Sequence, residues 1–161
     1  MKKIIAIVVA AVILAVAGWL ILKPEKDVEL PYCKNRKAML GLLGVPSGML
    51  KGLDINIAKI QKTHGVEIYG CKDNELSKIY LYCHNGKVAA VESSIFDPDM
   101  TVFYAAKKST RNFEMINSSD KFVKVADKHN GDVLIIKRVG PFTQVAVVKI
   151  GSADKVYEAI E

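Results

Sequence analysis

The clearest structural pattern in the chain is VEIYGCKDNELSKIYLYCHNGKVAAVESSI, residues 66–95, in which β-branched and aromatic residues alternate with polar ones. Two turn signals interrupt the alternation, Lys72-Asp73-Asn74-Glu75 and Asn85-Gly86. A period of two indicates strands with one buried face, and Asn-Gly is favoured at the centre of a type I′ hairpin turn. The sequence therefore predicts a three-stranded antiparallel meander.

The Asn-Gly pair also predicts how the second and third strands face each other. With Asn85-Gly86 at the two central positions of the turn, Cys83 lies opposite Val88 and Leu81 lies opposite Ala90. Because successive side chains of a strand point to opposite faces, Leu81 and Cys83 share one face with Ile79. We expect that face to be the core.

A second meander is expected in KFVKVADKHNGDVLIIKRVGPFTQVAVVKI, residues 121–150, where the triplet His-Asn-Gly returns at 129–131. The pattern predicts strands near 121–127, 132–139 and 143–150, followed by a helix over 152–160. An internal duplication would explain the recurrence, but Asn-Gly is the commonest hairpin signal, so we favour chance.

The remaining elements are predicted to be short. Apolar spacing indicates helices over 36–44, 54–63 and 109–116 and a strand over 101–106. An extended stretch over 53–57 is the alternative to the second helix. The expected fold class is thus α+β: a single N-terminal transmembrane helix, then one domain with antiparallel β-meanders, two Asn-Gly hairpins and three or four short helices.

The N-terminus predicts membrane attachment, because residues 4–22 are nineteen uncharged residues without proline, a length that spans roughly 28 Å as a helix. The expected organisation is a signal-anchor over 1–23, a linker over 24–36 and an extracytoplasmic domain over 37–161. Cleavage before Gly18 is the alternative, since small residues precede it.

The side of the membrane is predicted from the first residues. Met1-Lys2-Lys3 before an apolar run is typical of a bacterial export signal, so we expect a single-pass protein of the inner membrane with a periplasmic or extracellular domain. Lysines and Arg36 after the span favour the opposite orientation under the positive-inside rule.

The charge of the chain argues against nucleic acid as a partner. The net charge is +6, and without Lys2, Lys3 and Lys23 it falls to 20 basic against 17 acidic residues. There is no basic run interleaved with aromatic residues and no nucleic-acid-binding motif. We also expect no small-molecule ligand and no cofactor.

Cys83-His84 is the pair that most suggests chemistry. Zinc sites usually take close Cys or His pairs, and the chain has no Cys-x-x-Cys and no His-x-x-x-His. His84 should point to the face opposite Cys83. We therefore interpret the pair as a strand end and turn, and predict no metal ligand and no catalytic residue. A calcium site at Glu92, Asp97 and Asp99 lacks further acidic ligands at loop spacing.

A disulfide is expected if the domain is exported, and Cys33 is the cysteine that both others could reach. In the predicted hairpin Cys71 and Cys83 lie about 16 Å apart, beyond disulfide range. The candidate pairing is Cys33 with Cys83, and Cys33 with Cys71 is the alternative.

Two short pieces, MLGLLGVP at 39–46 and LYCHNGKVAAVE at 81–92, resemble small bacterial outer-envelope lipoproteins that combine a Leu-Gly-x-Pro helix end with an Asn-Gly or Asp-Gly hairpin. The likeness covers under a third of the chain, and the lipid-bearing cysteine of those lipoproteins is absent from it. We assign no family from it.

These observations favour a membrane-anchored, non-enzymatic module that binds a protein of the cell envelope, in a narrower form an inhibitor or immunity protein. Tyr69, Tyr80 and Tyr82 form the candidate binding patch. The alternatives are an accessory subunit of a larger membrane complex and a thiol-dependent envelope enzyme acting through Cys71 or Cys83.

Overall fold

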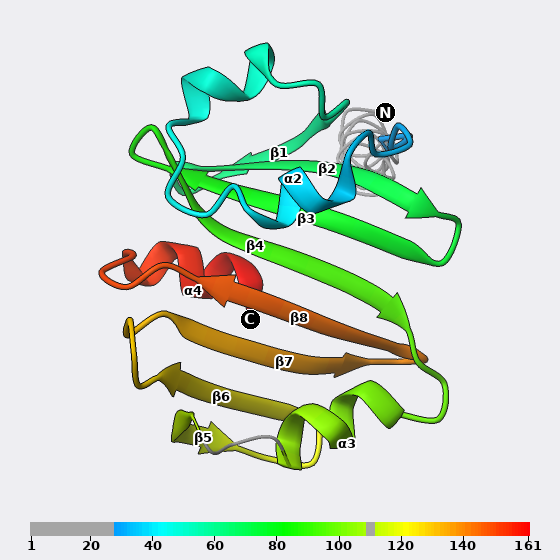
Figure 1. Cartoon of the computed structure of the whole chain (residues 1–161), viewed down its shortest axis with the longest axis vertical. Helices are drawn as coiled ribbons and strands as arrows, with labels where there is room; N and C mark the ends of the chain where they lie inside the picture. The colour runs from blue at the N-terminus through cyan, green and yellow to red at the C-terminus, as the bar shows by residue number, and fades with distance from the viewer. Residues whose placement is uncertain (1–27, 109–111) are drawn as a thin grey trace, which may run out of the picture.

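One continuous antiparallel sheet dominates the protein. A computed structural model describes residues 28–108 and 112–161, and in it eight strands are hydrogen-bonded in the order β1-β2-β3-β4-β8-β7-β6-β5 (Figure 1). The helices are few and short. The α+β prediction is therefore wrong, because the two meanders are not separate pieces among helices but halves of a single sheet.

Each half of the sheet is a four-stranded meander. The strands of the first half are β1 (Ala58–Thr63), β2 (Val66–Asn74), β3 (Ser77–His84) and β4 (Lys87–Phe96). Those of the second half are β5 (Phe113–Ser118), β6 (Phe122–Asp127), β7 (Val133–Val139) and β8 (Phe142–Val148). The helical elements are α2 (Arg36–Leu40), the 3-10 helix η1 (Ser47–Gly52), α3 (Thr101–Lys108) and α4 (Asp154–Ile160).

The strand order repeats itself about the centre of the sheet. Two short helical elements, α2 and η1, precede the four strands of the first half, and one, α3, precedes those of the second. The last strands of the two halves, β4 and β8, pair antiparallel. The two His-Asn-Gly triplets do not occupy equivalent places in this repeat, since the first joins β3 to β4 and the second lies between β6 and β7. The recurrence of His-Asn-Gly is therefore not a consequence of the repeated strand order.

The first Asn-Gly hairpin has the predicted register only in the two residue pairs nearest the turn. His84 pairs with Lys87 and Cys83 with Val88, but a bulge follows and Leu81 pairs with Val91 instead of Ala90. A bulge adds one residue to one strand, which alternation in the sequence does not reveal.

Three further predictions of local structure are wrong. Residues 54–63 contain β1, residues 109–116 overlap β5, and residues 101–106 belong to α3. Both misassigned strands are the edges of the sheet, where one neighbour suffices to impose extended backbone on a weakly patterned segment. Helix α3 begins where it does because Asp97 Oδ2 accepts the backbone N–H groups of Val102 and Phe103 at 3.0 and 3.3 Å.

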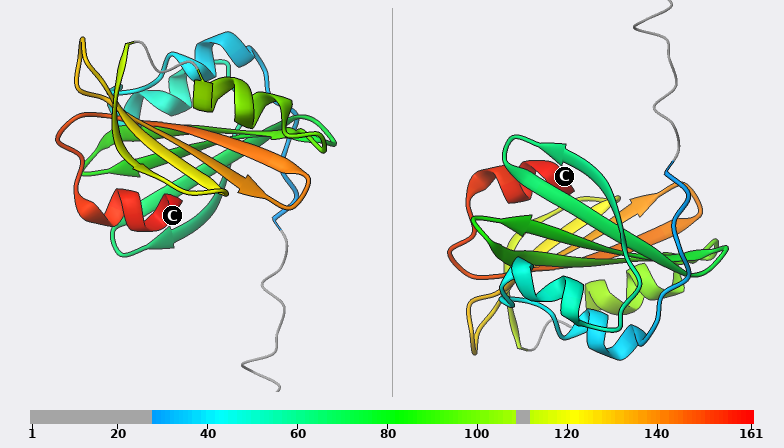
Figure 2. Two further views of the ribbon diagram at one scale, coloured as in Figure 1. Left: turned by 90° about the horizontal axis from the view of Figure 1, so that it is seen from below. Right: turned by 90° about the horizontal axis from the view of Figure 1, so that it is seen from above.

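The two faces of the sheet are covered by different helices. Helices α2, η1 and α3 lie on one face, and α4 lies on the other (Figure 2). Helix α4 touches both β2 and β8, which are separated in the sheet by two strands, so the sheet curves around α4 and its α4 side is concave. Ile79, Leu81 and Cys83 are buried on the convex side, as predicted for the core face.

A disulfide ties the segment before α2 to the sheet. Cys33 is bonded to Cys71 with a Cα–Cα separation of 5.0 Å, so the Cys33–Cys83 candidate is wrong. The backbone of Cys33 donates to the Lys72 carbonyl at 2.8 Å, and Lys72 donates to Pro31 at 2.9 Å. The end of the predicted linker thus pairs with the part of β2 that β1 leaves open. Cys83 lies opposite Glu67, toward the other end of β2.

The predicted transmembrane helix over residues 4–22 lies outside the described residues. Among those that the structure describes, no helix has the length and apolar character needed to cross a membrane.

Replacing Cys33 by Ser should lower the free energy of unfolding by about 2–4 kcal/mol, because the disulfide closes a loop across a sequence separation of 38 residues. Urea unfolding of the full chain measures the loss. A reductant should destabilise the wild type and the Cys83→Ala control but leave Cys33→Ser unchanged. Equal sensitivity of all three to reductant would contradict the bond.

Candidate functional site

The three tyrosines of the predicted patch do not form one surface. Tyr80 and Tyr82 lie on the concave face, whereas Tyr69 pairs with Leu81 and lies on the convex face. Tyr82 is 6% exposed, and its hydroxyl donates to Glu92 Oε2 at 3.1 Å. Tyr80 is half-buried and open to the concave side. Of the three, Tyr80 is the one placed to meet a ligand there.

A groove on the concave face is centred on Tyr80. It consists of three adjoining hollows of about 450, 300 and 210 Å³, and Tyr80 lines all three. Strands from both halves of the sheet, the end of α4 and the segment before α2 form its walls. We call it the Tyr80 groove and define it by Val28, Leu30, Ile60, Lys78, Tyr80, Gln144 and Ile160.

The absence of a side chain at Gly70 makes room for the Tyr80 ring. Gly70 pairs with Tyr80 across β2 and β3, and a Cβ added to it would lie 2.7 Å from Ile60 Cδ1 and 3.0 Å from Tyr80 Cδ1. The missing side chain therefore allows the ring and Ile60 to settle onto the sheet and leaves space above them. The groove depends on a glycine that is buried in mid-strand.

Helix α4 fills one end of the concave face. Val156 and Ile160 are 0% and 3% exposed, and the Lys137 ammonium donates to the carbonyl of Ile160. Lys124 Nζ lies 3.0 Å from Glu161 Oε1. A cation at a helix C-terminus interacts favourably with the helix dipole, so these lysines hold the end of α4 against the sheet. The groove begins where α4 stops.

Glu92 lies at the base of the groove and is 3% exposed. Burial raises the pKa of its carboxyl, against the opposing effects of the Lys137 charge and the Tyr82 hydroxyl. Burial, followed by the Glu92 charge, raises the pKa of Tyr82 as well. A buried carboxyl with a shifted pKa at the base of a groove is typical of a functional site, although structural networks produce it too.

The rim of the groove carries two lysines, Lys72 and Lys78, and one carboxylate, Glu75. Lys78 is exposed, and none of the salt bridges among the described residues involves it. Lys72 is compensated, because its Nζ lies 2.9 Å from Glu75 Oε1. A ligand that carries a carboxylate beside an apolar group would match Lys78 and Tyr80 together.

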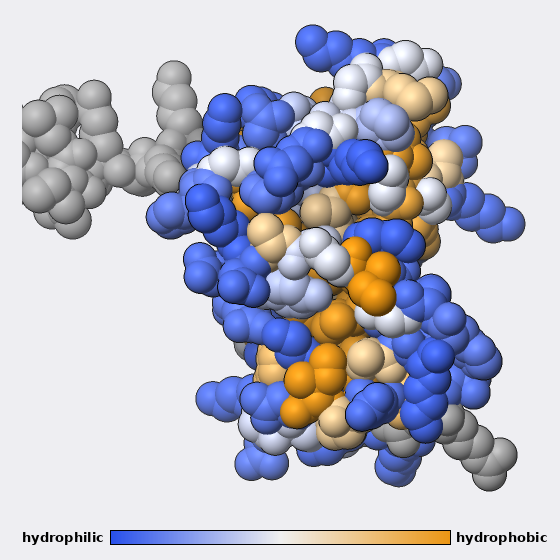
Figure 3. All heavy atoms as spheres, turned by 90° about the vertical axis from the view of Figure 1, so that its left-hand side faces the viewer, coloured by the Kyte–Doolittle hydropathy of each residue, from blue (hydrophilic) through white to orange (hydrophobic). Residues whose placement is uncertain are grey.

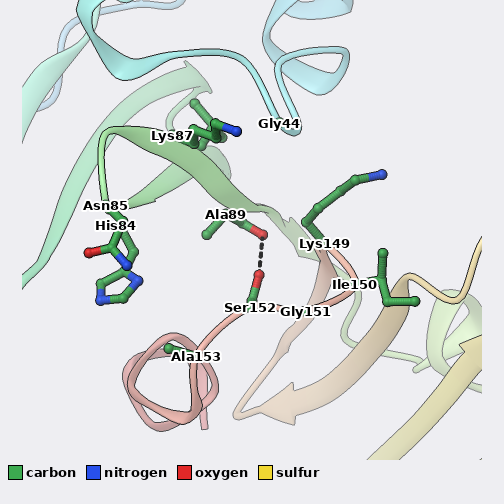
Figure 4. Close-up of a pocket in the computed structure, with 11 residues that line it drawn as sticks. Gly44, His84, Asn85, Lys87, Ala89, Lys149, Ile150, Gly151, Ser152 and Ala153 are labelled. Atoms are coloured by element: carbon green, nitrogen blue, oxygen red, sulfur yellow. Dashed lines mark hydrogen bonds between the residues drawn. The ribbon is translucent and has the colours of Figure 1, made fainter.

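A second cavity, of about 520 Å³, lies between the His84-Asn85 turn and the loop from Lys149 to Ala153 (Figure 4). Ser152 and His84 both line it, but the Ser152 hydroxyl donates to the Ala89 carbonyl at 3.4 Å and not to the imidazole. The pair therefore lacks the hydrogen bond of a nucleophile and its base. On this side of the molecule, hydrophobic surface lies in patches bordered by hydrophilic residues (Figure 3).

The cysteines do not form a thiol site in the described part of the chain. Cys71 is in the disulfide, and burial raises the pKa of Cys83 to about 11, with a smaller contribution from Glu67. A reactive thiol needs a lowered pKa. Within residues 28–108 and 112–161, no three His, Cys, Asp or Glu side chains gather as metal ligands would.

Comparison of the chain with known proteins found no related protein. No family model, no curated protein and no solved structure matches this chain.

Replacing Gly70 by Ala should lower the free energy of unfolding by about 1–3 kcal/mol, because the new methyl group displaces Ile60 and the Tyr80 ring. Gly48→Ala is the matched control, since a Cβ there meets nothing within 4 Å. Urea unfolding of both variants makes the comparison. Equal stabilities would show that Gly70 is not close-packed.

Replacing Glu92 by Gln should change how stability depends on pH. The folded state raises the Glu92 pKa above 4.5, so the folded protein retains a proton that the unfolded chain releases, and the wild type loses stability as pH rises through the folded pKa. Gln cannot titrate. The variant should therefore gain stability relative to the wild type between pH 4 and 8 in urea unfolding, and a constant difference would contradict the raised pKa.

Proposed function

We propose that this domain is a protein-binding module of the cell envelope and that the Tyr80 groove receives an extended segment of its partner. The observation that carries the proposal is the groove itself, where a half-buried tyrosine lies between aliphatic side chains and Lys78, a lysine in no salt bridge within the described part of the chain. Tyrosines in such settings supply much of the binding energy of protein interfaces.

The shape of the groove favours a peptide segment over a compact ligand. Its three hollows meet at Tyr80 and have partly different walls, so neighbouring side chains of one extended segment can each occupy a hollow. The aliphatic walls around Ile60 and Leu30 suit apolar side chains, and Lys78 suits an acidic one. The partner segment is thus expected to combine an aliphatic or aromatic residue with a neighbouring Asp or Glu.

The disulfide supports an extracytoplasmic location. Bonds between cysteines persist in oxidising compartments and are rare in the cytoplasm. The Cys33–Cys71 bond also holds the segment that carries Val28 and Leu30, two walls of the groove, against the sheet. Attachment through residues 4–22 stays a prediction from the sequence.

The test places a photo-reactive amino acid at Phe142, on the groove wall, in the full chain in intact cells. Tyr80→Ala and Lys78→Glu should each reduce the yield of a protein adduct about tenfold, equivalent to about 1.4 kcal/mol of binding free energy. Tyr69→Ala is the matched control, because Tyr69 lies on the convex face, and it should leave the adduct unchanged.

Three outcomes would count against the groove. If no adduct forms, the Tyr80 groove is not the binding site. If the adduct persists in Tyr80→Ala and Lys78→Glu, a partner lies near the groove but does not bind through these two side chains. Loss of the adduct in Tyr69→Ala alone moves the site to the convex face. The thermal midpoints of all variants must stay near that of the wild type for the comparison to hold.

A further inference from the structure

Apolar side chains form an exposed row across one end of the sheet, on its concave face. Phe142 pairs with Val139 on β7 and with Phe96 on β4, and the rings of Phe96 and Phe142 lie with their centroids 5.6 Å apart. Leu76, in the β2–β3 turn, lines one hollow together with Val139 and Phe142. Leu76, Phe96 and Val139 are 50%, 42% and 49% exposed. We call these four residues the end row.

The turns at the opposite end of the sheet are polar. Asn85-Gly86 joins β3 to β4, and residues 128–132, KHNGD, join β6 to β7. In the loop after β8, Ile150 lies beside Gly131 and is 57% exposed, but no other large apolar residue occurs in these turns. Adjoining exposed apolar side chains mark an interaction site, whereas a single exposed one does not. The end row is therefore the candidate interaction surface.

The described chain begins beside the end row. Val28 and Glu75 line one hollow, Glu75 and Leu76 line the next, and both views of Figure 2 show the first described residues next to the β7–β8 turn. The apolar run of residues 4–22 ends six residues before Val28, a distance that extended backbone spans in at most about 22 Å. With that run in a bilayer, as predicted, Val28 lies within about 22 Å of the hydrocarbon core, and headgroups fill about 5–8 Å of that distance.

The charges around the end row suit a phospholipid surface. Lys78 lines the same hollow as Leu76 and Phe142, is exposed, and makes no salt bridge with any described residue. The neighbouring carboxylates, Glu75 and Glu29, interact with Lys72 instead. Aromatic and aliphatic side chains beside a lysine are typical of the membrane interface, where the lysine meets lipid phosphate.

We infer that the end row docks on the phospholipid surface beside the point where the N-terminal apolar run enters the membrane. The β2–β3 and β7–β8 turns then face the lipid, and the polar turns of the opposite end face away from it. The inference rests on the predicted anchor over residues 4–22 and goes beyond the partner proposed for the Tyr80 groove.

The test uses the full chain in vesicles of phosphatidylcholine and phosphatidylglycerol that hold no other protein, so its result does not depend on the occupant of the groove. An environment-sensitive fluorophore is attached at Leu76→Cys, at Val139→Cys or, as the matched control, at Ile150→Cys. Each chain also carries Cys83→Ala, which removes the free thiol. A lipid with a nitroxide near its headgroup should quench the first two fluorophores and leave the third unquenched.

Variants test whether the end row itself makes the contact. Val139→Glu, measured with the fluorophore at position 76, should lower the ratio of docked to undocked domain about tenfold, because the lost apolar burial and the added carboxylate together cost about 1.4 kcal/mol. Leu76→Glu, measured at position 139, should have the same effect. Ile150→Glu is the matched control and should leave the ratio unchanged. All three positions are exposed, and equal thermal midpoints verify the fold.

Four results would overturn the inference. The first is no quenching at Leu76 and Val139, and the second is equal quenching at all three positions. The third is quenching that Val139→Glu and Leu76→Glu both leave unchanged. The fourth is a pair of fluorophores that are shielded from water but not quenched by the lipid, which would assign the end row to contact with a second copy. A chain that does not insert through residues 4–22 also overturns it, because the premise is then removed.

Discussion

The antiparallel pairing of β4 with β8 makes the eight-stranded sheet continuous. It runs from Ala90 opposite Val148 to Phe96 opposite Phe142 and joins two four-stranded meanders into one sheet. Each meander alone would leave its last strand as an unprotected edge with apolar side chains on both faces. The pairing removes those two edges, so the sheet is left with β1 and β5 as its only free sides among the described strands.

The curvature of that sheet determines where a ligand can bind. The convex face is covered at both ends, by α2 and η1 over the first half and by α3 over the second, and the concave face is covered in part by α4. Because α4 ends at Ile160 and Gly70 adds no side chain beside Tyr80, the concave face keeps a groove. Close packing would otherwise fill such a space with side chains.

Buried polar groups in this sheet are satisfied in two different ways. Asp97 accepts bonds from the Thr143 hydroxyl and from the first turn of α3, and although burial acts to raise its pKa, these bonds lower it. Glu92 accepts a hydrogen bond from the Tyr82 hydroxyl at 3.1 Å, and burial raises the pKa of its carboxyl. Asp97 is thus held as a charged structural cap, whereas Glu92 is a carboxyl whose charged form the fold disfavours, and it lies against the groove.

Local patterning in the sequence is enough to predict the strands with strong alternation and a turn signal between them, because period-two patterning and an Asn-Gly pair act locally. The sequence also identified Cys33 as one cysteine of the disulfide, whereas binding by Tyr80 stays a prediction. The folded structure was needed to show that 58–63 and 113–118 are strands, that Tyr69 and Tyr80 lie on opposite faces, and that Cys71 is the partner of Cys33. These depend on which strands become neighbours, and neighbours are chosen by contacts between residues far apart in the chain, which no local pattern contains.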